Sequence, residues 1–189
     1  RFNPVDGQLY VVGQSGWGTY STLDGCFQRL RYTGDPIQAP RSIRVVENGV
    51  VLGFNLPIDP SAVAKTGACF AQAWNYRYSG GYGSLEYSTK HPGTVGPDVL
   101  PIPGVPVVGD GRTLFLEIPD VQPVDTLHLR LDLGDGWPQE LFATVHKLAP
   151  AFADFPGYRP TAKVVAAHPR LADMAALKFK KAPNPWAKK

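Results

Sequence analysis

"SIRVVENGVVLGF", residues 42–54, places two short apolar runs on either side of an Asn-Gly step. Asn-Gly is the strongest short-range signal for a β-hairpin, because both central residues of the tight turn must tolerate a positive φ. The stretch therefore predicts two antiparallel strands, at 43–46 and 50–54. A hairpin alone is marginally stable in water, so further strands must complete a sheet around it.

Strand patterns continue from this hairpin to residue 148. Residues 126–133 alternate strictly, with four leucines on one face and polar side chains on the other. A period of two with one apolar face is typical of a half-buried antiparallel strand. Further strands are predicted at 68–78, 113–118 and 141–148. Six or seven short strands at this spacing predict an all-β chain with an immunoglobulin-like antiparallel β-sandwich over residues 42–148.

Two features interrupt the strand pattern. Pro60 suits the first position of a helix and Asp59 suits its cap, so a single helical turn is predicted there. Residues 74–106 form an insertion rich in aromatic residues, glycine and proline, most of which we expect to be loop.

The segments that flank the sandwich have patterns of their own. Residues 1–34 predict a separate hairpin, with strands at 8–13 and 26–32. Either this hairpin packs on the segments that come after it in the chain, or it is the last blade of a β-propeller whose other blades lie outside this chain. Residues 35–41 contain two prolines and predict a linker. Residues 149–189 lack sheet periodicity and predict an extended tail or interdomain linker, with a short helix at 171–179.

Composition agrees with many short strands. The 189 residues include 20 glycines and 19 prolines, well above the usual share of about 12%, and both residues punctuate the whole chain. The net charge is only +3, and five lysines lie between Lys178 and Lys189. We therefore expect no nucleic-acid partner, because such domains usually carry a basic face. The lysine-rich end predicts a solvated linker, with contact to an acidic polysaccharide as the alternative.

The sequence contains no recognisable catalytic or metal-binding motif. The four histidines, His91, His128, His146 and His168, lack the spacing of metal ligands. His128 and His146 could meet across adjacent strands, where a surface pair is favoured over a metal site. A serine nucleophile elbow and a phosphate-binding loop are also missing from the sequence. We therefore assign no catalytic, cofactor-binding or metal-binding residue to this chain. No apolar run reaches the ~20 residues of a membrane span, so no transmembrane segment is expected.

Aromatic and cysteine residues provide the remaining candidates. Trp74, Tyr76 and Tyr78 are spaced by two and should share one strand face, with Tyr82 nearby. Such a row can stack on sugar rings, but packing or an interface with a neighbouring domain is the favoured interpretation. Cys26 and Cys69 form either a disulfide or two buried free thiols, and both alternatives remain open at this stage.

Several stretches resemble parts of one family. "RFNPVDGQLYVVG" and "DGCFQRLRYTG" at residues 1–34 resemble the closing blade of the propeller in secreted bacterial proteins of the membrane-bound sugar-dehydrogenase type, which are similar to quinoprotein glucose/sorbosone dehydrogenases. "VVLGFNLPIDPSAV" at 50–63 and "VGDGRTLFLEIPDVQP" at 108–123 are similar to the surface-layer-type bacterial immunoglobulin-like domain. "WNYRYSGGYGSLEYS" at 74–88 resembles the insertion in that domain. "HPRLADMAALKFKKAPNPW" at 168–186 resembles the spacer before a cupredoxin or cytochrome module.

The resemblance implies that the chain is the C-terminal part of an exported multidomain protein, periplasmic or extracellular. Its partners would be adjacent domains of the same parent, a propeller and a cytochrome c or cupredoxin-like module. The parent would perform sugar oxidation with a quinone cofactor and haem c. This chain lacks a Cys-x-x-Cys-His haem motif, so those groups would belong to the parent. The expected function is a non-catalytic accessory or interdomain scaffold module. The alternative is a carbohydrate-binding module that uses the aromatic row at 74–78.

Overall fold

The computed structural model describes residues 1–14, 25–78, 80, 82–134, 138–153 and 155–163. The chain divides into two compact units, Arg1–Ile37 and Gln38–Lys189, which are called unit 1 and unit 2 below. The short helix predicted at 171–179 and the lysine-rich end lie outside the described residues.

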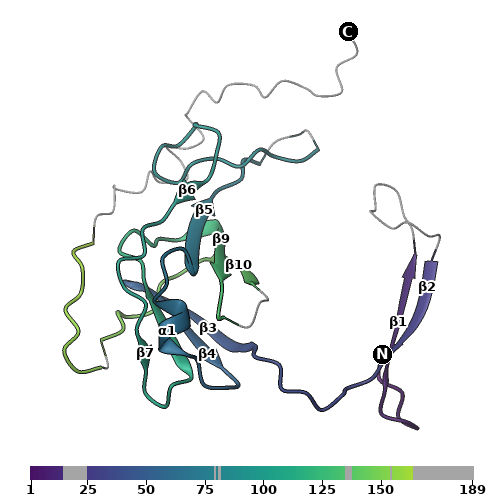
Figure 1. Ribbon diagram of the computed structural model, residues 1–189. Coiled ribbons are helices and arrows are strands. Elements are labelled where there is room, and N and C mark those ends of the chain that lie inside the picture. The colour runs from purple at the N-terminus through teal and green to yellow at the C-terminus, as the bar shows by residue number, and fades with distance from the viewer. Residues whose placement is uncertain (15–24, 79, 81, 135–137, 154, 164–189) are drawn as a thin grey trace. The chain divides into compact units, whose positions relative to one another are not determined.

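Unit 1 contains the predicted hairpin. Strands β1 (Leu9–Gln14) and β2 (Gly25–Leu30) form this hairpin (Figure 1). They pair antiparallel, in register from Leu9 opposite Leu30 to Gln14 opposite Gly25. The turn before β1 is held by Asp6, whose carboxylate accepts hydrogen bonds from the Gln8 backbone and the Tyr10 hydroxyl at 3.0 and 2.8 Å. These bonds hold the pKa of Asp6 below its usual value.

Unit 2 is the predicted all-β sandwich. One four-stranded antiparallel sheet has the order β3-β4-β8-β7, and the other has the order β10-β9-β5-β6. The first sheet consists of β3 (Pro40–Val46), β4 (Gly49–Phe54), β7 (Val107–Val108) and β8 (Thr113–Glu117). The second consists of β5 (Cys69–Trp74), β6 (Asp98–Val99), β9 (Val124–Leu131) and β10 (Gln139–Val145). In sequence order these strands follow the A-B-E-D and G-F-C-C′ arrangement of immunoglobulin-like sandwiches.

The core of unit 2 lies between the inner faces of the two sheets. Leu127, Leu129 and Leu131 of β9 are fully buried there, which confirms the leucine face predicted from the alternation. Val50 and Leu52 of β4 pack against them from the opposite sheet. A full turn of helix, α1 (Pro60–Val63), closes one end, and Asp59 caps it as predicted by accepting a bond from the Ser61 backbone at 2.8 Å.

The β3–β4 hairpin forms, but its turn differs from the predicted one. Val46 pairs with Gly49, so the central residues are Glu47 and Asn48, and neither has a positive φ. Gly49 is needed for a different reason. A Cβ on Gly49 would lie 2.0 Å from the carbonyl oxygen of Leu116 in the neighbouring strand β8. The glycine therefore allows β4 and β8 to approach each other, and its φ of +154° disfavours other residues.

The first part of the predicted tail is packed onto the sandwich. Phe152, Phe155 and Tyr158 gather around the ring of Phe115, with centroids 5.2, 6.0 and 5.7 Å away. Phe115 points outward from β8, on the face opposite the main core, and the tail buries it completely. The described residues of 149–163 therefore form an irregular segment without helix or strand, and its aromatic residues cover the outer face of a sheet.

Candidate functional site

The predicted aromatic row does not form a single exposed face. Trp74 ends β5 and is buried at 6% exposure, whereas Tyr76 is 46% exposed and Tyr78 and Tyr82 are fully exposed. The pairing with β9 ends where Trp74 faces Thr126. Beyond it the Tyr76 backbone donates to the Asp125 carboxylate at 2.7 Å, and the chain leaves the sheet. Trp74 is therefore inaccessible to a ligand, and of the three residues expected to share one face only Tyr76 and Tyr78 are exposed.

A different aromatic group occupies the outer face of the β10-β9-β5-β6 sheet. The His128 ring on β9 stacks parallel to the Phe142 ring on β10, with centroids 4.4 Å apart and planes 2° apart. Phe70 and Trp74 of β5 meet the other side of the imidazole edge-on, each with a centroid distance of 6.3 Å. We call these four residues the aromatic ridge. Phe142 is its most exposed member, at 61%.

Hydrogen bonding orients the imidazole within the aromatic ridge. The Gln72 side-chain amide lies 3.0 Å from Nδ1 of His128, and an amide N–H donated there leaves the proton of a neutral ring on Nε2. Nε2 lies 3.8 Å from a carboxylate oxygen of Glu140, beyond hydrogen-bonding distance. Nε2 of His128 and Nε1 of Trp74 are both buried without a hydrogen-bond partner among the described residues. The ridge is thus a packed aromatic cluster with one open end.

The predicted pairing of His128 with His146 does not occur. His128 faces Gln72 on one side and Phe142 on the other. β10 ends at Val145, which pairs with Val124, so His146 lies past the end of the ladder. The alternation of β9 indicated on which face His128 lies, but the register that chooses its neighbour could not be deduced from the sequence.

The insertion between β5 and β6 is organised by one carboxylate. Asp98 accepts bonds from the backbones of Thr89 and Lys90 and from the hydroxyls of Ser88 and Thr89, at 2.6–2.8 Å. Burial raises the pKa of Asp98, but these four donors together lower it below its usual value. Lys90 also bonds Asp120 at 2.5 Å, which ties the insertion to the loop after β8. The arrangement holds a loop in place and leaves the carboxylate saturated with protein donors.

Both cysteines are free thiols in the structure. Cys26 lies on β2 of unit 1 and is exposed, so the expectation of two buried thiols is wrong for this residue. Cys69 lies on β5 of unit 2 and is partly buried. Burial, followed by the nearby negative charge of Asp132, raises the pKa of Cys69 to about 11. Cys69 is therefore a poor nucleophile, because the thiolate is the reactive form.

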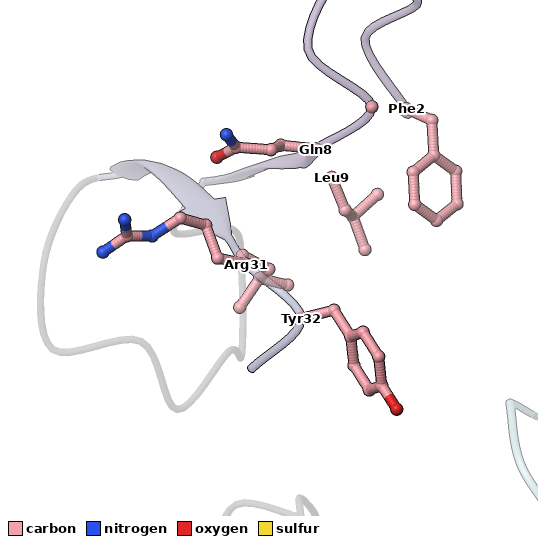
Figure 2. A pocket seen from close by; sticks show the side chains of 7 residues that line it. Phe2, Gln8, Leu9, Arg31 and Tyr32 are labelled. Carbon is pink, nitrogen blue, oxygen red and sulfur yellow. The ribbon is translucent and has the colours of Figure 1, made fainter. Parts of the chain in front are cut away.

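Unit 1 exposes large apolar side chains on both faces of its hairpin. One face has an open hollow of about 510 Å³, which includes Phe2, Leu9 and Tyr32 in its lining. Figure 2 shows these three side chains pointing to the same side of the hairpin, away from Gln8 and Arg31. Tyr32 as a whole is 82% exposed.

The opposite face of the hairpin is also apolar. The rings of Tyr10 and Phe27 stack across the two strands with centroids 5.6 Å apart, and both line a second open hollow of about 570 Å³. Val12 and Phe27 remain 75% and 72% exposed. A two-stranded sheet has no second layer with which to bury such side chains.

The described residues contain no group of three or more His, Cys, Asp or Glu side chains that could hold a metal ion. Within the same residues, no helix is long and apolar enough to cross a bilayer. Comparison with known proteins gave no significant match to a family model, a curated protein or a solved structure. Any assignment of function therefore depends on the surfaces described above.

Proposed function

We propose that this chain is a non-catalytic accessory module of an exported multidomain protein, in which unit 1 supplies two strands to a neighbouring β-propeller domain and unit 2 acts as a spacer. The exposure of apolar side chains on both faces of the unit 1 hairpin carries this proposal. Burial of one such side chain stabilises a protein by about 1.5–3 kcal/mol. Because Val12 and Phe27 lie on one face and Leu30 on the other, the hairpin gains most when other sheets pack against both of its faces.

The edges of the hairpin support the same arrangement. β1 and β2 pair only with each other as strands. The outer edge of β1 is partly covered, because Tyr10 exchanges backbone hydrogen bonds with Arg1 and Phe2 forms a bridge with Leu9, whereas no described residue pairs with the outer edge of β2. Adding strands to such edges satisfies these groups by main-chain hydrogen bonds and needs no special side chains. A propeller blade is a small antiparallel sheet of this kind.

Unit 2 suits the role of a spacer because it is complete as a sandwich. It has its own core between two sheets, and the segment 149–163 covers the outer face of one of them. The resemblance of the sequence to secreted sugar-dehydrogenase proteins supplies the proposed context, a periplasmic or extracellular parent. Quinone and haem chemistry would take place in other domains of that parent.

Hydrogen exchange of the full chain tests the proposal. Without its partner sheet, the amides of β1 and β2 should exchange at least ~100-fold faster than those of β4 and β8, because a lone hairpin opens easily. Equal protection of the two sets would contradict the proposal, since it would show the hairpin sealed within this chain. The gene sequence is a second test. Blade-like repeats upstream of the Arg1 codon would support the proposed parent protein with a β-propeller. A start codon and signal peptide directly before Arg1 would contradict it.

A further inference from the structure

The four edge strands of the sandwich differ in how well they are protected. β6 and β7 contain two residues each, which gives another strand little to pair with. β3 begins with Pro40 and has a bulge at Arg41, and Ala149 pairs with its other end. Short strands, proline, bulges and covering segments are the usual means by which proteins block edge-to-edge association.

β10 has none of these protections. It is seven residues long and contains no proline, lysine or arginine, and Glu140 is its only charged residue. The bulge in the β9–β10 pair places its extra residue on β9, because Asp125 and Thr126 together face Thr144. β10 itself therefore remains regular. Among the described residues, no strand pairs with its free edge.

The outward-facing side chains of β10 also leave an aromatic surface open. One face of the Phe142 ring is covered by the stacked His128 ring. β10 is the outermost strand, so the second face of Phe142 is directed past the sheet edge, which explains its 61% exposure. The aromatic ridge thus ends at a ring that is already oriented for stacking on another ring.

We propose that two copies of this chain associate through β10, antiparallel about a two-fold axis at Phe142. In this register, Phe142 faces Phe142 of the partner subunit, which extends the aromatic ridge across the interface. Glu140 faces Thr144 of the partner subunit, and Leu141 faces Ala143 of the partner subunit. No like charges are opposed, and the pairing continues the sheet from four strands to eight.

The sequence of β10 favours a second copy as the occupant because it is complementary to itself in this register. An aromatic pair opposite each other across antiparallel strands is a favourable contact. A two-fold contact uses the same patch on both molecules, so both free edges are satisfied at once. This contact lies in unit 2 and does not involve the unit 1 hairpin.

Sedimentation equilibrium of the full chain tests the proposal. The chain of 20.5 kDa should show a mass that doubles as its concentration rises through the micromolar range. Phe142→Lys should be monomeric throughout, because it places two ammonium groups opposite each other. Val99→Lys is the matched control, because Val99 lies on the edge strand β6 with the same 61% exposure, and it should still dimerise.

A charge-exchange experiment separates the contact from general effects on folding. Phe142→Glu should also be monomeric, and an equimolar mixture with Phe142→Lys should recover the dimer as a heterodimer. A wild-type chain that is monomeric at all concentrations overturns the proposal, and so does a Phe142→Lys variant that still dimerises. A loss of dimer in Val12→Lys would place the contact on the unit 1 hairpin and would overturn it as well.

Discussion

Asn48→Ala should release the segment 149–163 from the outer face of the sandwich. The Asn48 side chain donates from Nδ2 to the Phe152 carbonyl at 2.8 Å and to the Tyr158 hydroxyl at 3.0 Å. Its Oδ1 accepts from the Phe152 backbone at 2.8 Å. Each such bond contributes about 0.5–1.5 kcal/mol, so the loss of three should weaken docking by about 2–4 kcal/mol.

The measurement is hydrogen exchange of the amides between Phe152 and Thr161, together with unfolding by denaturant. Amides protected by docking should exchange about 30–1,000-fold faster in Asn48→Ala, since 1.4 kcal/mol corresponds to a tenfold change. Asn48→Asp keeps Oδ1 as an acceptor but turns a carboxylate oxygen toward the Phe152 carbonyl in place of the donor, so its effect should be at least as large as that of Asn48→Ala. Asn3→Ala, which removes exposed side-chain hydrogen bonds in unit 1, is the control and should leave these amides unchanged.

Glu117 should keep one end of the segment 149–163 attached when Asn48 is replaced. Its carboxylate accepts from the Tyr158 hydroxyl at 2.9 Å and from the Thr161 backbone at 2.7 Å, so the far end of the segment keeps an anchor in Asn48→Ala. Loss of protection should therefore be largest near Phe152. Unchanged exchange at Phe152 would refute the reasoning, because it would show that ring packing on Phe115 holds the segment without Asn48.

Two further predictions concern single sites. Gly49→Ala should lower the free energy of unfolding by about 3 kcal/mol or more, because the new Cβ would overlap the Leu116 carbonyl and φ is positive. Gly109→Ala, whose φ is also positive but whose surroundings are open, should cost about 1–2 kcal/mol, and equal thermal shifts would contradict this account. Cys69 should react with iodoacetamide at pH 8 about 100-fold more slowly in the folded than in the denatured chain, because its pKa rises from 9.0 to about 11. Mass spectrometry of a Cys26→Ala background measures both rates, and similar rates would disprove the expected burial.

The strands of the sandwich could be predicted because their signals are local. The leucine alternation in β9 and the cap and proline of α1 act over a few residues, and the structure confirms them. β6 and β7 were not anticipated, since two residues carry no periodicity. The segment 149–163 was missed for a related reason. It packs through irregularly spaced aromatic residues and through polar bonds to Asn48 and Glu117, more than 40 residues away in the sequence.

The candidate site could be predicted only in part. Spacing by two correctly describes a strand, but it does not show where the strand ends, and β5 ends at Trp74. Side chains on the outer face of a sheet can also be buried by neighbours, as Trp74 is beside His128. The ridge combines residues from three strands whose order and register arise from the tertiary fold. The sequence placed Phe142 in the strand predicted at 141–148, but nothing in it indicated the contact between Phe142 and His128.

Residues 149–163 cover the outer face of the β3-β4-β8-β7 sheet, so this face of unit 2 is closed to a ligand or partner. Phe115 and Val51 point outward from the β3-β4-β8-β7 sheet, and both are buried under residues 149–163. A ligand at this face would first have to displace the segment, including the bonds of Asn48 and Glu117. The outer face of β10-β9-β5-β6 carries no such constraint at its β10 edge, where Phe142 is exposed. A partner of unit 2 should therefore bind at β10. Asn48→Ala should leave the proposed dimer through Phe142 unchanged, because Asn48 acts on the other sheet.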